Sequence, residues 1–320
     1  MKQPKFIMLV GLPGSGKSTY ANKLKEDLNC VVHSSDSIRL ELFGDVKDQS
    51  NNKLVFETLH KRVREDLING KNVIYDATNI SSKRRKSFLY QLSKIDCYKE
   101  CHFIATPYEV CVSQNNNRET TVPLGVIDKM YTTFDIPFYD EGWHQIELVY
   151  TDNNYKKAYG SWSQFIFDTL DFEQDNPHHN LTLGRHCLKC KEGVETYLTK
   201  LSKEVKHSEE LLVAAALHDN GKPFVKNFLN SKGEVTEFAH YYEHECVGAY
   251  NSLFYDMDSN IDRLYVATLI RWHMILHFFK DWKPETQKRY VDRFSKGLYF
   301  QYTNFWLNLQ ILHEGDRYAH

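Results

Sequence analysis

Short apolar runs alternate with helix-like segments through the first half of the chain. Five such runs cover residues 6–10, 30–36, 72–76, 100–106 and 146–150. Apolar runs of this length are typical of parallel strands buried on both faces. Strands that alternate with helices predict a parallel sheet covered on both sides. The first half is therefore predicted to be an α/β domain with helices on both faces of its sheet.

The pattern changes near residue 160. Residues 153–160 are polar without a clear period, and from residue 163 onward helix follows helix with short breaks. With 320 residues, the chain is also longer than one typical domain. We predict an α/β domain over residues 1–155, with a mobile lid, and an all-α domain over residues 163–320.

Composition narrows the class of protein. Hydrophobic residues make up 42% of the chain, yet no apolar run approaches the roughly 20 residues that span a bilayer. The first residues show no secretory signal pattern, and seven cysteines suit a reducing compartment, so we expect a cytoplasmic protein. The net charge of −2 argues against a duplex-binding protein with a broad basic surface. Any nucleic acid is expected to be held locally, as a strand end.

The turn after the first apolar run carries a phosphate-binding motif. Its sequence fits G-x-x-x-x-G-K-[ST] between a strand and a helix, which is the context that gives the motif its meaning. Backbone amides of such a loop surround phosphate, while Lys17 reaches the β- and γ-phosphates of ATP and Ser18 contacts Mg²⁺. The predicted ATP contacts are Gly11, Gly14, Ser15, Gly16, Lys17, Ser18 and Thr19.

Acidic residues follow two of the other predicted strands. Ligands of parallel sheets bind beyond the carboxyl ends of strands, so Asp36 and Asp76 are expected beside the phosphate site. Asp36 either acts as the base that accepts the proton of an acceptor hydroxyl, or caps the following helix. Arg39 is placed to hold an acceptor phosphate. Asp76 either orients Mg²⁺ through Ser18 or forms a turn.

Two further segments carry candidate substrate contacts. Residues 82–86 begin a helix with four basic side chains, including Arg85, which either form a solvated face or approach a polyanionic acceptor. Residues 115–123 form a polar loop that ends in proline, which is typical of a mobile lid. Arg118 in this loop either stabilises charge on the transferred phosphoryl group or faces solvent.

These motifs resemble those of polynucleotide 5′-hydroxyl kinases of the phage and bacterial end-healing type. The resemblance rests on GLPGSGKST, SSDSIR, YDATN and NNNRETTVP in this order, and it covers most of residues 1–150. It implies that Lys17 and Ser18 bind ATP and Mg²⁺, that Asp36 is the general base, that Arg39 holds the acceptor phosphate, and that Arg118 is the lid arginine.

Histidine is unevenly distributed. Eleven of the 15 histidines lie at or beyond His178, which points to metal chemistry in the second half. The His218-Asp219 pair ends an apolar helix, so both side chains can reach one ion, and a carboxylate can bridge two ions. Mixed nitrogen and oxygen ligands suit Mn, Fe, Co, Ni or Zn. The predicted metal ligands are His186, His218, Asp219, His244, His273 and Asp316.

This ordered set resembles the HD phosphohydrolase superfamily over roughly residues 172–320. The segment NPHH before His186, GKP after the His-Asp pair and YYEHE around His244 add to the resemblance. The resemblance implies an all-helical metal-dependent phosphohydrolase in which Asp219 takes part in catalysis. Lys222 is predicted to contact the substrate, whereas His277, His313 and His320 are predicted to be bystanders.

Two rival motifs are weaker. His240 to His244 fits H-x-x-E-H, an inverted zinc-protease motif, but this interpretation leaves the other predicted ligands unexplained. Cys187 and Cys190 form a lone C-x-x-C without a second pair, and the spacing of one helical turn favours packed thiols over a zinc site.

The sequence thus predicts a bifunctional enzyme that repairs nucleic-acid ends. A kinase would phosphorylate 5′-hydroxyl ends of RNA or DNA, and the metal domain would remove a 2′,3′-cyclic or terminal phosphate on the 3′ side, leaving ends for a ligase. Two alternatives stay open: a small-metabolite kinase fused to a nucleotide phosphohydrolase, and an ATP-gated switch with the second domain as sensor.

Overall fold

A computed structural model describes residues 3–177, 179–201, 204–296 and 301–320. The chain divides into two compact units. The first comprises Met1–Tyr131 and Pro137–Tyr155, and the second comprises Thr132–Ile136 and Lys156–His320. Within the described ranges, no helix is both long and apolar enough to cross a membrane.

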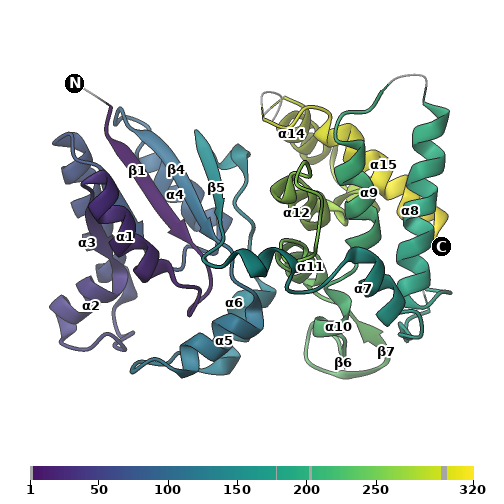
Figure 1. Ribbon diagram of the computed structural model, residues 1–320, viewed down its shortest axis with the longest axis horizontal. Helices are drawn as coiled ribbons and strands as arrows, with labels where there is room; N and C mark the ends of the chain where they lie inside the picture. Colours follow the sequence, from purple (N-terminus) through teal and green to yellow (C-terminus); the bar gives the residue numbers. More distant parts are fainter. Residues whose placement is uncertain (1–2, 178, 202–203, 297–300) are drawn as a thin grey trace. The chain divides into compact units, whose positions relative to one another are not determined.

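The first unit is built on a five-stranded parallel sheet with the order β2-β3-β1-β4-β5 (Figure 1), which confirms the predicted α/β fold. All five predicted strands are present. The strands are β1 (Lys5–Val10), β2 (Val31–Ser34), β3 (Val73–Asp76), β4 (Tyr98–Ile104) and β5 (Gln145–Val149). The helices are α1 (Lys17–Leu28), α2 (Ser35–Phe43), α3 (Asn52–Ile68), α4 (Ser82–Gln91), α5 (Tyr108–Asn116) and α6 (Leu124–Thr132).

Helices cover both faces of this sheet. On one face, Ile7 and Leu9 of β1 pack against Ala21 of α1. On the other face, Phe6 of β1 lies 5.6 Å, centroid to centroid, from the ring of Phe88 in α4. Alternate residues of a strand point to opposite faces, so an apolar strand such as β1 serves both layers. Because β1 and β3 are neighbours, their carboxyl ends bring the glycine-rich turn and Asp76 to one edge of the sheet.

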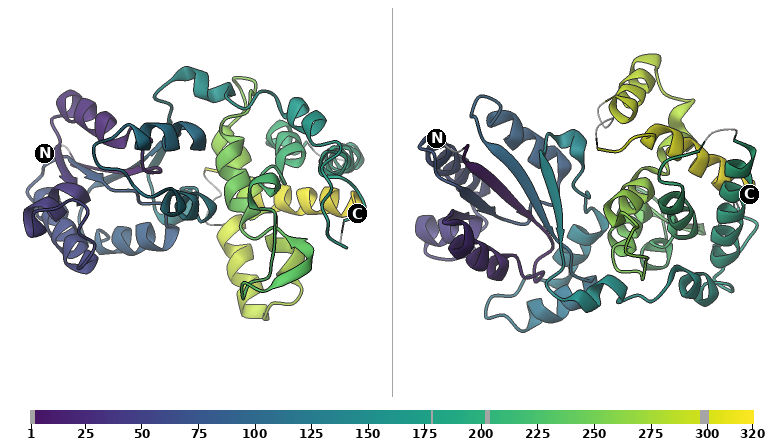
Figure 2. Two further views of the ribbon diagram at one scale, coloured as in Figure 1. Left: turned by 90° about the horizontal axis from the view of Figure 1, so that it is seen from below. Right: turned by 45° about the horizontal axis from the view of Figure 1, so that its top comes forward.

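The second unit is mainly helical. Its helices are α7 (Trp162–Asp168), α8 (Leu183–Lys200), α9 (Ser208–Leu217), α10 (Lys222–Val225), α11 (His244–Ser252), α12 (Arg263–Trp272), α13 (Ile275–Phe279), α14 (Pro284–Ser295) and α15 (Phe305–Tyr318). The yellow α15 runs beside α8 (Figures 1 and 2).

The prediction that this unit is all-α is wrong in one place. An antiparallel hairpin joins β6 (Asn227–Leu229) to β7 (Val235–His240). Its turn is stabilised by Asn230, whose Oδ1 accepts hydrogen bonds from the backbone N–H groups of Lys232 and Glu234. Gly233 completes the turn with φ +80°, a conformation that favours glycine. This Asn-Ser-Lys-Gly turn was a usable hairpin signal in the sequence.

Glycines allow two close approaches that position candidate site residues. A Cβ on Gly315 of α15 would lie 2.5 Å from Val194 Cγ2 and 2.8 Å from the carbonyl oxygen of Cys190, both on α8. A Cβ on Gly221 would lie 2.1 Å from the carbonyl oxygen of His244. The first contact brings Asp316 to α8, and the second brings the start of α11 to the segment after the His-Asp pair.

Candidate functional site

The residues predicted to bind ATP lie in the turn between β1 and α1 and in the first turn of α1. Gly14 and Gly16 have φ values of +78° and +89°, which favour glycine. A Cβ on Gly14 would lie 2.2 Å from the carbonyl oxygen of Cys111. Thr106 donates a hydrogen bond from Oγ1 to the carbonyl oxygen of Ser15 at 3.0 Å. The loop is therefore held in a fixed shape next to the start of a helix, where backbone N–H groups can bind an anion.

Lys17 begins α1 and turns back over this loop. Its Nζ donates to the carbonyl oxygens of Leu12 at 2.7 Å and Gly11 at 3.0 Å. Burial lowers the pKa of Lys17, against the nearby charge of Asp76. Thr19 is exposed on the first turn of α1. The ammonium group is thus held within the turn that is predicted to surround the phosphates.

Ser18 and Asp76 meet at the ends of neighbouring elements. Ser18 Oγ donates a hydrogen bond to Asp76 Oδ2 at 3.0 Å. Burial raises the pKa of Asp76, while Lys17 acts in the opposite direction. A hydroxyl and a carboxylate side by side at a phosphate-binding loop are the oxygen ligands that Mg²⁺ uses in P-loop enzymes.

Asp36 and Arg39 form an ion pair on the first turns of α2. Arg39 Nη1 donates to Asp36 Oδ1 at 2.9 Å, and its Nη2 donates to Asn52 Oδ1 at 3.1 Å. The Asp36 side chain is 61% exposed, whereas that of Arg39 is 7% exposed. The helix is capped by Ser34, whose Oγ accepts a hydrogen bond from the Asp36 N–H. The alternative in which Asp36 caps this helix is therefore wrong.

Arg118 lies in the loop between α5 and α6. The loop is closed at its base by Asn115, which exchanges two hydrogen bonds of 2.9 Å with the backbone of Val122. Arg118 is exposed, and its charge helps to lower the pKa of Lys17, an effect that is smaller than that of burial. The arginine therefore stands within electrostatic reach of the phosphate-binding turn.

Arg85 does not occupy the place predicted for a substrate contact. Its side chain and that of Glu141 have no exposed surface, and the two form a bidentate pair with distances of 2.7 and 2.6 Å. Arg85 also donates to the carbonyl oxygen of Asn79, and Glu141 accepts from Trp143 Nε1. A guanidinium group that is buried and fully engaged in this way contributes to the fold and cannot reach an acceptor in this arrangement.

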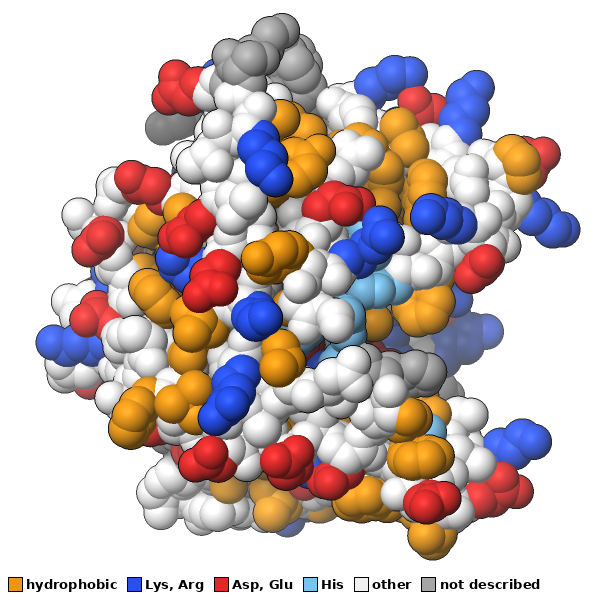
Figure 3. Space-filling model, turned by 90° about the vertical axis from the view of Figure 1, so that its right-hand side faces the viewer, with side chains coloured by type: hydrophobic (Ala, Val, Ile, Leu, Met, Phe, Trp, Pro, Cys, Tyr) orange, Lys and Arg blue, Asp and Glu red, His pale blue; other side chains and the backbone are white. Residues whose placement is uncertain are grey.

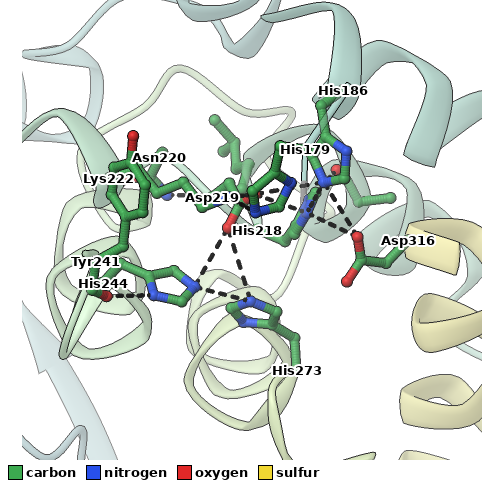
Figure 4. A network of polar contacts seen from close by, with 12 residues as sticks. His179, His186, His218, Asp219, Asn220, Lys222, Tyr241, His244, His273 and Asp316 are labelled. Atoms are coloured by element: carbon green, nitrogen blue, oxygen red, sulfur yellow. Dashed lines mark hydrogen bonds and ion pairs between the residues drawn. The ribbon is translucent and has the colours of Figure 1, made fainter. Parts of the chain in front are cut away.

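Four of the six predicted metal ligands meet at one point of the second unit (Figure 4). His186 Nε2 lies 3.1 Å from His218 Nε2, 3.4 Å from Asp219 Oδ2 and 3.1 Å from Asp316 Oδ1. His218 Nε2 lies 3.3 Å from the same Asp219 oxygen. Asp316 Oδ1 also lies 3.7 Å from His218 Nε2. Two nitrogens and two oxygens thus converge from α8, the end of α9 and α15.

The other oxygen of Asp219 faces the remaining two predicted ligands. His244 Nε2 lies 3.3 Å and His273 Nε2 lies 3.9 Å from Asp219 Oδ1, and the two nitrogens are 3.2 Å apart. His244 begins α11 and His273 follows the last residue of α12. The structure therefore brings all six predicted ligands into two groups that share one carboxylate.

The histidine rings are oriented by backbone carbonyl groups. In three rings, Nδ1 lies 2.7–2.9 Å from the carbonyl oxygen three residues earlier: His218 to Ala215, His244 to Tyr241, and His273 to Ile270. A carbonyl oxygen only accepts, so each Nδ1 carries a proton, and when the ring is neutral its Nε2 lone pair points into the centre. Metal-binding histidines in proteins are oriented by the same type of contact. The donor set therefore fits divalent transition ions.

Charge supports this interpretation. Although burial alone would raise the pKa of Asp219, the charges of Lys222 and His218 hold that pKa well below its usual range. Burial and the neighbouring His244 keep the pKa of His273 well below its usual value, so this ring is neutral. Although burial would lower the pKa of His218, the charge of Asp219 holds it well above its usual value. A cation bound by this ring and by the ionised Asp219 would take the place of that proton.

Lys222, predicted to contact substrate, lies against Asp219. Its Nζ is 2.7 Å from Asp219 Oδ2, 2.7 Å from Gln174 Oε1 and 3.3 Å from His179 Nε2. It also stands 5.2 Å from the centre of the Tyr241 ring. Figure 3 shows histidine side chains that reach the surface in one place, with Lys and Arg side chains beside them. The positive charge of these Lys and Arg side chains favours an anionic ligand.

Some neighbours of the cluster were missed by the sequence analysis. His277, predicted to be a bystander, lies with Nε2 2.8 Å from Asp316 Oδ2, and its position one helical turn after His273 was the available signal. His320 Nε2 lies 3.6 Å from Asp316 Oδ1. His178 is outside the described residues. His313 packs its ring on that of His277.

The rival motifs do not form sites. His240 lies in β7 with Nε2 3.0 Å from Thr236 Oγ1. Among the described residues it belongs to no group of side chains that could hold an ion, so the protease interpretation is not supported. Cys187 and Cys190 are buried as free thiols on α8, and burial raises the pKa of both, as expected of packed thiols.

Comparisons with known proteins bear on the first unit. Residues 6–137 match the family model described as an AAA domain. The chain is 25% identical over 200 residues to the L-seryl-tRNA(Sec) kinase of Methanococcus maripaludis, which covers 61% of this chain and 75% of that protein. It is 28% identical over 148 residues to protein kti12 of Schizosaccharomyces pombe, covering 41% of this chain and 51% of that protein.

The first unit carries a P-loop kinase-like domain. This follows from the parallel sheet, the glycine-rich turn and the match of residues 6–137 together. Among solved structures, the Pnkp1/Rnl/Hen1 RNA repair complex is 28% identical, with a TM-score of 0.37, over 42% of this chain and 44% of that chain. The chain thus spans less than half of that solved protein and about half of kti12.

Proposed function

We propose that the protein is a bifunctional nucleic-acid end-healing enzyme. A 5′-hydroxyl polynucleotide kinase domain would occupy residues 1–155, and a metal-dependent phosphohydrolase domain of the HD type would occupy residues 163–320. The kinase transfers the γ-phosphate of ATP to a 5′-hydroxyl end, and the second domain removes a 2′,3′-cyclic or terminal phosphate from the 3′ side. The products would suit a ligase, and the cytoplasm is the expected compartment.

The Asp36–Arg39 pair is the observation that carries the kinase proposal. The exposed carboxylate can accept the proton of an acceptor hydroxyl, since the buried guanidinium group holds it in place from one side. Arg39 Nη2 would have to exchange Asn52 Oδ1 for a phosphate oxygen to hold an acceptor phosphate with its planar fork. Lys17 would exchange its carbonyl partners for phosphate oxygens of ATP. Arg118 would approach the transferred phosphoryl group from the loop between α5 and α6.

The shared carboxylate of Asp219 carries the phosphohydrolase proposal. Its two oxygens face two separate groups of imidazole nitrogens, as required of a residue that bridges two ions. Two divalent ions supply an activated water and a clamp on phosphate oxygens. The protein's own part is to hold the imidazoles in fixed orientation, to keep Asp219 ionised beside Lys222, and to offer positive charge to an anionic substrate.

The test measures both reactions on the whole chain. γ-labelled ATP with matched 5′-hydroxyl RNA and DNA oligonucleotides reports the kinase and its preferred acceptor. A 2′,3′-cyclic phosphate end incubated with Mn²⁺, Ni²⁺, Co²⁺ or Zn²⁺ reports the second activity. No label transfer to either oligonucleotide would contradict the kinase proposal, and no release of phosphate with any ion would contradict the other.

A second candidate is a kinase that acts on a hydroxyl group of a different acceptor. The relative from Methanococcus maripaludis is named for a seryl-tRNA substrate, and it aligns over 200 residues. The phosphate-binding turn, Asp36 and Arg118 would serve that chemistry equally well. Label transfer to a small metabolite or an aminoacyl-RNA, without transfer to 5′-hydroxyl ends, would favour this candidate.

A further inference from the structure

Each of the three protons of the Lys222 ammonium group has an acceptor in the structure. An ammonium group only donates, and its acceptors are Asp219 Oδ2, Gln174 Oε1 and His179 Nε2 at 2.7, 2.7 and 3.3 Å. The orientation of Gln174 is fixed independently, because its Nε2 donates to the carbonyl oxygen of Leu181 at 2.9 Å. The oxygen of this amide is therefore the atom that faces Lys222.

This arrangement determines the tautomer of His179. Its Nε2 accepts from Lys222, so the ring proton of the neutral imidazole must sit on Nδ1. The Nδ1 atom is buried, and in the described chain it has no hydrogen-bond partner. A buried donor without an acceptor costs stability. A ligand that binds in this site and accepts the Nδ1–H hydrogen bond would remove that cost.

His179 lies directly at the proposed metal centre (Figure 4). Its ring centroid is 5.4 Å from that of His186, and one of its ring nitrogens lies within 4.8 Å of a nitrogen of His186. A phosphate held by ions beside His186 and Asp219 is therefore within reach of this ring. Because phosphate oxygens only accept while ionised, they are the natural partner of an N–H donor.

We propose that His179 is a neutral hydrogen-bond donor that binds a non-bridging phosphate oxygen of the substrate through Nδ1–H. The proposal rests on the phosphohydrolase function given above. Lys222 does not bind this oxygen directly but fixes the tautomer that makes His179 a donor. His179 thereby becomes a substrate-binding residue that lies outside the set of metal ligands.

Two substitutions test the roles of the two ring nitrogens of His179 independently. His179→Asn places an amide N–H near the position of Nδ1 and removes the partner of Lys222. His179→Gln places an amide oxygen near the position of Nε2, which preserves the bond from Lys222, and removes the Nδ1 donor. The full-length protein loaded with Mn²⁺ is titrated with inorganic phosphate, and the same samples are assayed for phosphate release from a cyclic phosphate end.

We expect His179→Gln to weaken phosphate binding and to lower kcat/KM by roughly 10- to 100-fold, whereas His179→Asn stays within about 5-fold of the unaltered protein. Both variants should bind as many Mn²⁺ ions per chain as the unaltered protein. Thermal unfolding of each variant checks that it is folded.

The other outcomes overturn the proposal. Unchanged phosphate affinity in His179→Gln would show that the Nδ1 donor is not used. A larger loss in His179→Asn than in His179→Gln would assign the effect to the Lys222 contact, and equal losses in both would show that the Nδ1 donor alone does not bind the phosphate. The loss of an ion in either variant would make His179 a metal ligand, with His320 as its neighbour at a ring distance of 5.0 Å. If the unaltered protein binds Mn²⁺ and phosphate but releases none, only the proposed reaction fails.

Discussion

His244 Nε2 lies 3.2 Å from His273 Nε2, although both rings use their Nδ1 protons for carbonyl oxygens of the chain. Two neutral rings in this arrangement direct lone pairs at each other, which is unfavourable without a cation between them. A divalent ion bound by both nitrogens and by Asp219 Oδ1 would remove this repulsion. The pair is therefore a direct structural reason to expect metal.

Metal removal should destabilise the second unit. A ligand that binds only the folded state stabilises it by about 2.7 kcal/mol at a free concentration 100 times its Kd. We expect Mn²⁺ to raise the melting temperature of the chelator-treated protein. The unaltered protein should bind two ions per chain, and His273→Ala should bind one. Two ions in His273→Ala would show that this ring is not a ligand.

The reaction in the second unit should depend on Asp219. Asp219→Asn keeps the shape of the side chain but removes the charge that the two imidazole groups and Lys222 share. We expect metal-dependent phosphate release to fall below detection, while transfer of phosphate from ATP continues at the normal rate. Loss of both activities in a folded variant would contradict two independent sites.

The kinase reaction, but not phosphate release, should depend on Asp36. Asp36→Asn removes the proposed base, so the rate of phosphoryl transfer should fall by about 10²- to 10⁴-fold, while phosphate release is unchanged. Asp45→Asn is a suitable control, because Asp45 is also an acidic residue of the first unit. In the described part of the chain, its side chain accepts one hydrogen bond, from the nearby Lys47 N–H. Similar losses in both variants would exclude a specific role for Asp36.

The sequence was informative where function depends on local order. The strand, glycine-rich turn and helix are consecutive, so their geometry follows from a few neighbouring residues such as Gly14 and Gly16. The six candidate metal ligands could also be identified from their order along the chain. The division of Asp219 between two groups could not, because it depends on how α11, α12 and α15 pack around one carboxylate.

Long-range contacts account for most of the errors. Arg85 belongs to a basic run, and nothing in that run reveals a partner 56 residues away at Glu141. His277 was set aside since its carboxylate partner, Asp316, comes 39 residues later. The acceptor for Lys222 at Gln174 was missed for the same reason. Side-chain type predicted the chemistry, but tertiary packing decided which charged groups face substrate.

Arg85 should prove to be a stability residue. Arg85→Met leaves Glu141 buried without its partner, and breaking a buried ion pair in this manner costs about 3–5 kcal/mol. We expect a large fall in the free energy of unfolding of the first unit, measured by urea denaturation. Lys83→Met, on the exposed side of the same helix, should change it little. An unchanged stability together with a raised KM for the acceptor would restore Arg85 as a substrate contact.

Gly315 should control the position of Asp316. A Cβ at this position would come within 2.8 Å of the carbonyl oxygen of Cys190, a backbone atom that cannot move without shifting α8. Gly315→Ala should therefore push α15 from α8, lower stability by about 1–3 kcal/mol, and weaken Mn²⁺ binding because Asp316 moves with its helix. Gly125→Ala is the matched control, since a Cβ there meets nothing within 4 Å and alanine favours the helix. Normal Mn²⁺ affinity in a destabilised Gly315→Ala variant would mean that Asp316 is not required to hold the ion.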